Sequence, residues 1–315
     1  MKITRTRRTT ALAATLVAGL ALSACGSNGD DMGSEGGDTG STGEAGAGGD
    51  AEGDQTIVLG YIPSWTDGLS TAYLLENQLE AAGYTVEHQE ITEAAILYTG
   101  LANGDIDIYP SAWPEVTHVD YMEQYGEDIE DLGAYYDNAK LTIAVPEYVD
   151  VDSIADLQGQ GDRFGGRIVG IEPGAGLTRV TKESVIPTYG LEDEYTLAES
   201  STTAMLAELQ EAVDNQEDIV VTLWRPFWAN SSFPVKDLED PEGALGESEG
   251  LHFLATKGFS EEFPEVAEWI SQIKLDDDQY GSLEDMVVNQ YEGDPAGGVA
   301  AWLEENPDVI PPLGG

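Results

Sequence analysis

The chain has 315 residues, of which 13 are basic and 60 acidic, giving a formal net charge of −47 at pH 7. This charge excludes nucleic acid and anionic lipid headgroups as binding partners, because both are polyanions. The acidic side chains also repel one another in the folded state unless salt screens this repulsion. We therefore expect a protein from a cell that lives in high salt; an ordinary acidic secreted protein is the alternative.

The first 25 residues are typical of an export signal. Four basic residues within 2–8 precede an apolar run at 11–22, which is too short to span a bilayer. Leu22-Ser23-Ala24-Cys25 then resembles a bacterial lipobox, and Cys25 is the only cysteine of the chain. We predict a lipidated Cys25 that anchors the mature protein to the outer face of the cell membrane. A leftover thiol near an ordinary cleavage site is the alternative.

Residues 26–54 differ in composition from the rest of the chain. They hold eleven Gly and eight acidic residues, with no Lys, Arg or aromatic residue. Such a segment cannot bury enough apolar surface to fold, so we predict a disordered, acidic tether. Residues 55–315 remain, enough for one large or two modest lobes, and carry 52 acidic and nine basic residues.

Alternating strand and helix patterns begin at residue 56. Hydrophobic periodicity predicts strands and helices in turn at 56–61, 69–82, 85–89, 94–103 and 106–109. The first of these helices buries one face and ends at a glycine; the residues concerned are Ala72, Leu75, Leu79, Ala82 and Gly83. This order implies parallel strands with helices on both faces of a sheet.

A second series of the same kind follows a strand predicted at 141–145. Its elements are a short helix, a strand, two helices and a strand, at 153–157, 168–171, 178–188, 201–213 and 219–223. A polar passage then leads to one more strand and three helical segments, at 251–256, 266–273, 283–289 and 296–304.

Two such series, joined at two places, predict an α/β protein of two Rossmann-like lobes with a ligand cleft between them. The first lobe would contain 55–142 plus 249–315, and the second 143–248. Ligands of open α/β sheets lie beyond the carboxyl ends of the strands, and a cleft can close like a hinge. We therefore expect the cleft to be lined by the loops that follow Tyr61, Tyr109, Ile171 and Leu223.

The sequence offers no apparent parts for catalysis or for metal binding. Motifs for a serine nucleophile, a zinc site, a phosphate loop and a Cys pair are absent, and His88, His118 and His252 fall on different elements. We expect no enzyme activity, no cofactor and no metal. Two alternatives remain open: a surface-anchored hydrolase, and a purely structural surface lipoprotein.

Tryptophans gather at the ends of the predicted strands. Four of the six lie there: Trp65, Trp113, Trp224 and Trp228. A lone tryptophan is more often a packed aromatic, but several indole faces around one pocket attract a cation that lacks N–H groups. Each such contact contributes about 0.5–2 kcal/mol. The pattern predicts a trimethylammonium cage, with Trp65, Trp113, Trp224 and Trp228 as its candidate walls.

Two helix starts are candidates for binding the anionic end of such a ligand. Gly68-Leu69, at the beginning of the first predicted helix, offers unpaired backbone N–H groups and the positive end of the helix dipole. Gly174-Ala175-Gly176-Leu177 is the second candidate, with Gly176 and Leu177 as its ligand-binding residues. A plain helix start is the alternative for each.

These residues resemble the glycine betaine and proline betaine binding proteins of osmoregulatory ABC importers. The resemblance covers almost all of 55–315, and the stretches that carry it include Leu59-Gly60-Tyr61-Ile62-Pro63, Gly104-Asp105-Ile106-Asp107, Ala112-Trp113-Pro114, Gly170-Ile171-Glu172-Pro173-Gly174-Ala175-Gly176 and Val220-Val221-Thr222-Leu223-Trp224-Arg225-Pro226. It implies a type II periplasmic binding protein without catalysis. It also implies an aromatic box for a betaine between the lobes, and an ABC permease as partner.

Carried over by motif, Trp113 and Trp224 match box tryptophans, and Gly68-Leu69 matches a backbone pair that receives the carboxylate in one branch of the family. Another branch has a box tryptophan where this chain has Ala175, and we expect Trp65 to replace that wall. Phe227 stands where many relatives have a histidine that contacts the carboxylate. Choline, carnitine, ectoine and proline betaine therefore remain alternative ligands to glycine betaine.

Overall fold

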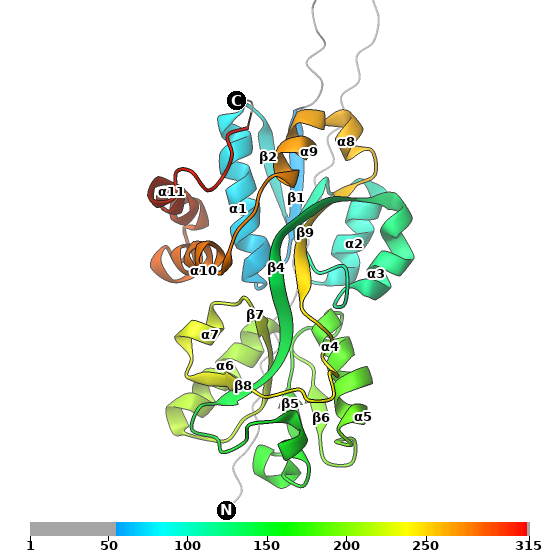
Figure 1. Ribbon diagram of the computed structural model, residues 1–315, viewed down its shortest axis with the longest axis vertical. Coiled ribbons are helices and arrows are strands. Elements are labelled where there is room, and N and C mark those ends of the chain that lie inside the picture. The colour runs from blue at the N-terminus through cyan, green and yellow to red at the C-terminus, as the bar shows by residue number, and fades with distance from the viewer. Residues whose placement is uncertain (1–54, 314–315) are drawn as a thin grey trace, which may run out of the picture. The chain divides into compact units, whose positions relative to one another are not determined.

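A continuous path of hydrogen-bonded strands runs through residues 55–313, the part of the chain that the computed structural model describes. The strand order is β2-β1-β3-β9-β4-β7-β5-β6, and β8 pairs with β4 beside this path. The strands are β1 (Thr56–Tyr61), β2 (Thr85–Glu90), β3 (Ile108–Ala112), β4 (Ile129–Pro146), β5 (Arg167–Val169), β6 (Thr196–Ala198), β7 (Val221–Arg225), β8 (Val235–Asp237) and β9 (Glu249–Thr256). Helices flank both ends of this path, as Figure 1 shows.

The first lobe, as the name is used below, consists of β1, β2 and β3 with the helices that flank them. β1 pairs in parallel with both β2 and β3, as the alternation of strands and helices predicted. Its helices are α1 (Thr66–Ala81), α2 (Ala94–Asn103), α3 (Val119–Tyr125), α8 (Phe259–Glu262), α9 (Pro264–Ser271), α10 (Asp277–Asp285) and α11 (Pro295–Glu305), with a 3-10 turn at Gly126–Asp128 and a π-helix at Met286–Gln290. α10 and α11 both pack against α1.

The second lobe consists of β5 to β8 with α4 to α7. β5 pairs in parallel with β6 and β7. Its helices are α4 (Gly176–Val180), α5 (Ile186–Thr188), α6 (Thr202–Asn215) and α7 (Ala229–Ser232), a π-helix at Thr181–Val185 between α4 and α5, and 3-10 helices at Ile154–Leu157 and Gly161–Phe164. Ser201 caps α6 by accepting the backbone N–H of Ala204 at 3.1 Å.

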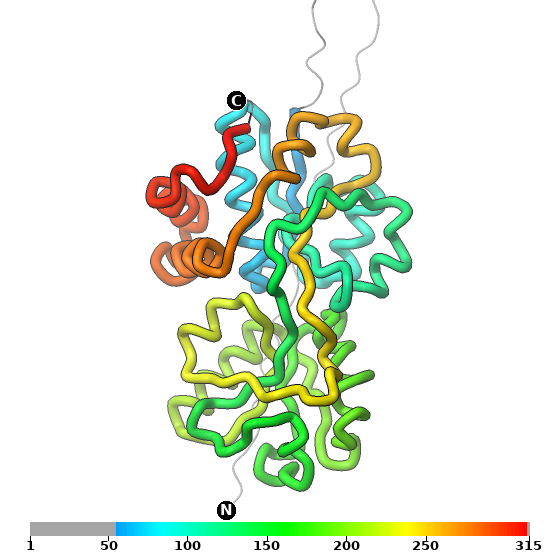
Figure 2. Tube along the Cα trace, in the orientation of Figure 1, coloured from blue at the N-terminus to red at the C-terminus, as the bar shows by residue number. Residues whose placement is uncertain are grey.

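The chain passes between the two lobes along β4 and β9, which pair antiparallel with each other. β4 is 18 residues long, so its first part pairs with β9 and its second part, Lys140 to Ala144, pairs with β7. Figures 1 and 2 show these two strands side by side, in green and gold, along the junction of the lobes. The predicted lobe bounds fall inside β4, at 142–143, and just before β9, at 248–249.

Several predicted elements agree with the structure in place and type, and others differ at their ends. β1 and α2 have the predicted bounds, and Gly83 follows α1 with φ +96°. α1 begins at Thr66, three residues earlier than expected, and Ala82 is exposed rather than buried. β7 extends through Arg225, so Trp224 lies inside the strand and not after it, as the sequence had suggested.

The elements that the sequence did not predict are short or interrupted. They are α3, the first part of β4, β6, α7, β8 and α8. Acidic side chains and register shifts break the apolar pattern of β4 before Ala139, and β6 has only three residues at the end of the strand path. Such segments give no sustained hydrophobic period for a sequence reading to detect.

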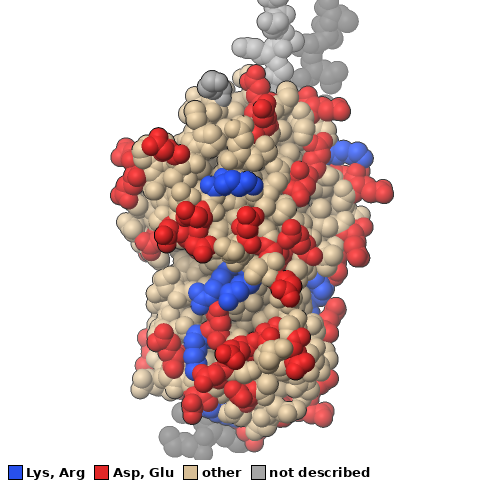
Figure 3. Space-filling model, viewed as in Figure 1, with Lys and Arg blue, Asp and Glu red and all other residues tan. Residues whose placement is uncertain are grey.

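Acidic side chains are spread over both lobes on the face that Figure 3 shows, and basic side chains are few. Within residues 55–313, no helix is both long enough and apolar enough to cross a membrane. The predicted signal segment, Cys25 and the tether lie outside the residues that the structure describes.

Candidate functional site

A cavity lies where the loops after β1, β3 and β5 approach β4 and β7. It has a volume of about 340 Å³, part of which is open to solvent. Both lobes contribute to its wall, and the lining residues are Trp65, Asp67, Trp113, Thr117, His118, Leu141, Ile171, Ala175, Gly176, Leu177 and Trp224.

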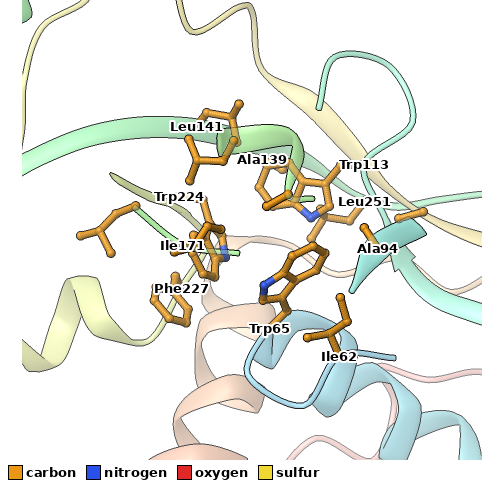
Figure 4. Close-up of a cluster of buried hydrophobic side chains, with 14 of the residues drawn as sticks. Ile62, Trp65, Ala94, Trp113, Ala139, Leu141, Ile171, Trp224, Phe227 and Leu251 are labelled. Carbon is orange, nitrogen blue, oxygen red and sulfur yellow. The ribbon is translucent and has the colours of Figure 1, made fainter. Parts of the chain in front are cut away.

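Three of the four tryptophans predicted to form the cage line this cavity. Trp65 precedes α1, Trp113 follows β3, and Trp224 is in β7; their side chains are 8%, 5% and 5% exposed. Figure 4 shows the three indoles in one cluster, contributed by different elements. Phe227 stacks on Trp224, with ring centroids 4.0 Å apart and an angle of 21° between the planes. The structure thus brings together indole faces that are far apart in sequence.

Trp228 and Leu69 do not line this cavity. Both border a separate hollow, which also contacts residues of α6 and of the segment after α10. The half-buried ring of Trp228 packs on Phe227 and Phe233 instead.

Gly68-Leu69 does not offer the free amides that the sequence suggested. Because α1 begins at Thr66, the N–H of Leu69 already donates to the carbonyl of Trp65, at 3.2 Å, as a regular helical bond. The N–H of Gly68 donates to the carboxylate of Asp67. In contrast, Gly176 and Leu177 do line the cavity, at the start of α4.

Asp67 is a cavity residue that the sequence reading did not select. Its side chain is only 2% exposed, and its Oδ2 accepts hydrogen bonds from Trp113 Nε1–H at 3.0 Å and from Ser111 Oγ–H at 2.8 Å. Burial raises the pKa of Asp67 above its usual range, against the effect of these donors, which lower it. A cation bound in the cavity would favour the ionised carboxylate.

His118 is the second cavity residue that was not predicted from the sequence as part of the site. Its ring stacks on Trp65, with centroids 5.9 Å apart and 18° between the planes. Burial first, and Arg179 second, lower the pKa of His118 to about 3, so the ring is neutral at pH 7. Nδ1 accepts the backbone N–H of Trp113 at 3.3 Å and lies 3.1 Å from the hydroxyl of Tyr98. The ring proton is therefore on Nε2, which is a hydrogen-bond donor.

The loop that carries Trp113 and His118 is held by a buried carboxylate at the start of β9. The oxygens of Glu249 accept the backbone N–H groups of Glu115, Val116 and Thr117, at 3.0–3.1 Å. The hydroxyl of Thr117 also donates to Glu249. Three backbone donors on one carboxylate fix the course of this loop, so the cavity wall on this side is rigid.

The two lobes are in direct contact around the cavity. The hydroxyl of Tyr121 donates to the carbonyl of Gly174 at 2.8 Å, and Arg179 Nε donates to Asp120 Oδ2 at 3.0 Å. A Cβ atom on Gly176 would lie 1.9 Å from the carbonyl oxygen of Thr117, far inside van der Waals contact. Only glycine permits this approach, and the cleft is therefore closed in this structure.

The lining of the cavity is chemically suited to a small organic cation. Within residues 55–313, no group of three or more His, Cys, Asp or Glu side chains is arranged to hold a metal ion. The lining has apolar and indole surfaces, one carboxylate and one neutral imidazole. Such a set can hold a small organic cation and donate one hydrogen bond to its polar end.

Sequence reasoning missed Asp67 and His118 because single polar residues carry no motif of their own. With 52 acidic residues in 55–315, no particular aspartate stands out. Their positions do hold a signal: Asp67 lies two residues after one cage tryptophan and His118 five residues after another, in loops already expected to line the cleft.

The chain is similar in sequence to a curated protein and in structure to a solved one. The glycine betaine/carnitine transport binding protein GbuC of Listeria monocytogenes is 32% identical over 154 residues, and the match covers 48% of this chain and 49% of that protein. The chain thus spans about half the length of this curated relative in the match. The crystal structure of the glycine/betaine/L-proline-binding protein ProX of Borrelia burgdorferi has 31% identity and a TM-score of 0.76, covering 82% of this chain and 96% of that one.

A structure of an ABC-transporter choline binding protein in complex with choline is also similar. It has 25% identity and a TM-score of 0.72, and the superposition covers 82% of this chain and 91% of that one. The two-lobed fold of a type II periplasmic binding protein is therefore common to these chains. The family described as the substrate binding domain of ABC-type glycine betaine transport systems matches residues 55–305. The chain belongs to this family.

Proposed function

We propose that this chain is an extracytoplasmic binding protein that captures glycine betaine or a related quaternary-ammonium osmolyte and passes it to an ABC permease. The observation that carries this proposal is the convergence of Trp65, Trp113 and Trp224 with the buried carboxylate of Asp67 on one small cavity. A trimethylammonium group has no N–H to donate, so it is selected by indole faces and by negative charge rather than by hydrogen bonds.

The cationic end of the ligand lies among the three indoles in this proposal. Trp113 has two roles, because its ring faces the cavity while its Nε1–H holds Asp67. Since cation–π contacts in a desolvated site contribute up to about 2 kcal/mol each, three of them and one carboxylate account for strong binding of a small ion.

The polar end of the ligand would meet His118 and the start of α4. Nε2–H of His118 is the donor that remains on that ring, and the amides of Gly176 and Leu177 begin α4 beside the cavity. In this arrangement His118 would contact the carboxylate of the ligand. The family resemblance gives this role to a histidine at the position that Phe227 occupies here.

Choline is a second candidate ligand, and Asp67 specifically favours it. Choline carries a net positive charge, whereas glycine betaine is a zwitterion with no net charge at pH 7. The cavity contains a carboxylate but no basic side chain. A net cation would therefore balance the charge of Asp67 without bringing a second carboxylate close to it. The hydroxyl of choline could also accept from His118.

We further propose that the two lobes have the predicted bounds, 55–142 plus 249–315 and 143–248, and that ligand-induced closure presents both to the permease. The contacts that hold the cleft shut support closure as part of this cycle. In our proposal, the segment before residue 26 directs export, lipidation of Cys25 anchors the protein to the outer face of the membrane, and 26–54 is its tether.

Titration calorimetry of the full chain with choline, glycine betaine, carnitine, proline betaine and ectoine, in high salt, tests the proposed function. Trp224→Ala should weaken binding of the preferred ligand about tenfold to a hundredfold, since it removes one cation–π wall and its buried area. Trp228→Ala is the matched control, because Trp228 is outside the cavity, and it should bind like the parent. Equal affinity of Trp224→Ala and the parent would disprove the box.

A further inference from the structure

The residue before α1 is held by groups from both lobes, although it is itself part of the first lobe. Trp65 stacks on His118 of its own lobe and donates its Nε1–H to Glu172 Oε2 of the second lobe, at 3.2 Å. Ser64 Oγ also lies 3.5 Å from Glu172 Oε1. The indole that is expected to replace the wall missing at Ala175 is thus fixed from across the cleft.

Glu172 is itself held firmly by the second lobe. It lies after β5 and is 8% exposed. Oε1 accepts the backbone N–H of Thr202 at 2.9 Å, and Oε2 accepts the hydroxyl of the same residue, also at 2.9 Å. The start of α6 therefore fixes the position of the Glu172 carboxylate. Oε2 also accepts the Nε1–H of Trp65.

Capping of α6 does not by itself account for this carboxylate. Ser201 already caps that helix through Ala204. Burying a charge is costly unless it is fully hydrogen-bonded, and here the bonds come from both sides of the cleft. The contacts with Trp65 and Ser64 are the part of this network that opening of the cleft would break.

A second carboxylate holds the same segment from the first lobe. Glu284 of α10 accepts the hydroxyl of Thr66 and is also hydrogen-bonded by the backbone N–H of Trp228, in the second lobe. Glu284 is 2% exposed. The residues on either side of Trp65 are therefore fixed by buried carboxylates that each bridge the two lobes.

We propose that Glu172 is a positioning residue, which orients the indole of Trp65 as the third wall of the cation cage, and does so only when the lobes close. In the open protein Trp65 Nε1–H loses its acceptor, and only the stacking on His118 still orients the ring. Cage assembly and closure are then one event. The inference rests on the proposed function, since it concerns recognition of a quaternary ammonium ion.

A double-mutant cycle on the full chain tests whether Glu172 acts through Trp65. Trp65→Phe keeps a ring but removes the N–H, and Glu172→Gln removes the charge of the acceptor. Each should weaken binding of choline or glycine betaine about tenfold, the scale of one lost charge-assisted hydrogen bond. The double variant should bind no more than about twofold more weakly than the weaker single variant, because both changes break the same contact.

Trp113→Phe combined with Glu172→Gln is the matched control. The N–H of Trp113 donates to Asp67 and not to Glu172, so these two losses should multiply. If the losses of Trp65→Phe and Glu172→Gln multiply as well, Glu172 does not act through Trp65 and the inference is wrong. If the parent binds none of the ligands, the proposed function fails instead.

The indole N–H signals give a readout that does not depend on affinity. In tryptophan-labelled protein, the Trp65 signal is identified by its loss in Trp65→Phe. Glu172→Gln should shift this signal and speed its solvent exchange at least tenfold, while the Trp113 signal stays in place. An unchanged Trp65 signal would overturn the inference. Glu172→Asp, whose shorter side chain also fails to bridge Trp65 and Thr202, replaces the Gln variant if that variant does not fold.

Discussion

Asp67→Asn removes one negative charge from the cavity and leaves almost everything else in place. The substituted side chain has the same shape, and its amide oxygen can still accept from Trp113 and Ser111, which both donate to Oδ2 in the parent. The change therefore separates the contribution of charge from that of packing.

The size of the effect follows from the burial of Asp67, which is 2% exposed. Two unit charges roughly 5 Å apart, at an effective dielectric constant of about 20, attract by about 3 kcal/mol. This corresponds to about a hundredfold in affinity for choline. Glycine betaine should lose about tenfold or less, since its own carboxylate is repelled by Asp67 and is relieved by the substitution.

Calorimetric titration of both ligands into parent and variant measures these losses. Asp162→Asn, at an exposed position that is not part of the cavity lining, is the control for a general change in charge. Because burial raises the pKa of Asp67, the fold disfavours ionisation of this carboxyl relative to the unfolded chain; Asp67→Asn removes that cost and should melt no lower than the parent. Equal losses for the two ligands, or none, would refute the charge argument.

Three further predictions concern closure, pH and salt. Gly176→Ala should abolish closure and weaken binding at least a hundredfold in calorimetry, because its Cβ would lie 1.9 Å from the carbonyl oxygen of Thr117. Gly174→Ala is the control and should bind like the parent, since the atom nearest to its Cβ would be 3.6 Å away. Similar affinities for the two variants would contradict the closed packing. Burial raises the pKa of Glu284 from 4.5 to about 8, so its neutral form stabilises the fold fully below pH 4.5 and this contribution is lost as the pH rises to about 8. The free energy of unfolding of the parent, derived from thermal melts, should therefore fall relative to that of Glu284→Gln across this range, by at most about 1.4 kcal/mol per pH unit. If the two free energies change in parallel with pH, Glu284 does not have this raised pKa. Finally, the melting temperature should rise between about 0.1 M and 2 M KCl, because salt screens the repulsion among the acidic residues; a fall would show that this repulsion is not a main cost.

The architecture was largely accessible from sequence because its signals are local. β1 and α2 have sustained hydrophobic periods, and their bounds were predicted correctly. The first part of β4 was not predicted, since its pairing with β9 depends on register shifts and on partners more than a hundred residues away. A hydrophobic pattern within one window does not report such partners.

The candidate site was accessible in part, for a related reason. Tryptophans are rare, so three of them after strands pointed to one place, and the structure brings them together. Leu69 was assigned a free amide because the start of α1 was expected three residues too late. Asp67 depends on a tertiary hydrogen bond from Trp113, and His118 on stacking against Trp65, and no motif in the sequence expresses either contact.

The pairing of Leu141 with Trp224 couples the connection between the lobes to the chemistry of the cavity. Leu141 lies on β4, directly opposite Trp224 on β7, and both side chains line the cavity. Successive side chains of a strand point to opposite faces, so a slip of one residue would turn Leu141 outward. An insertion or deletion between Ile129 and Leu141 that shifts the register of β4 would therefore also change the cavity wall. The length of this connection between the lobes and the shape of the binding site are thus constrained together.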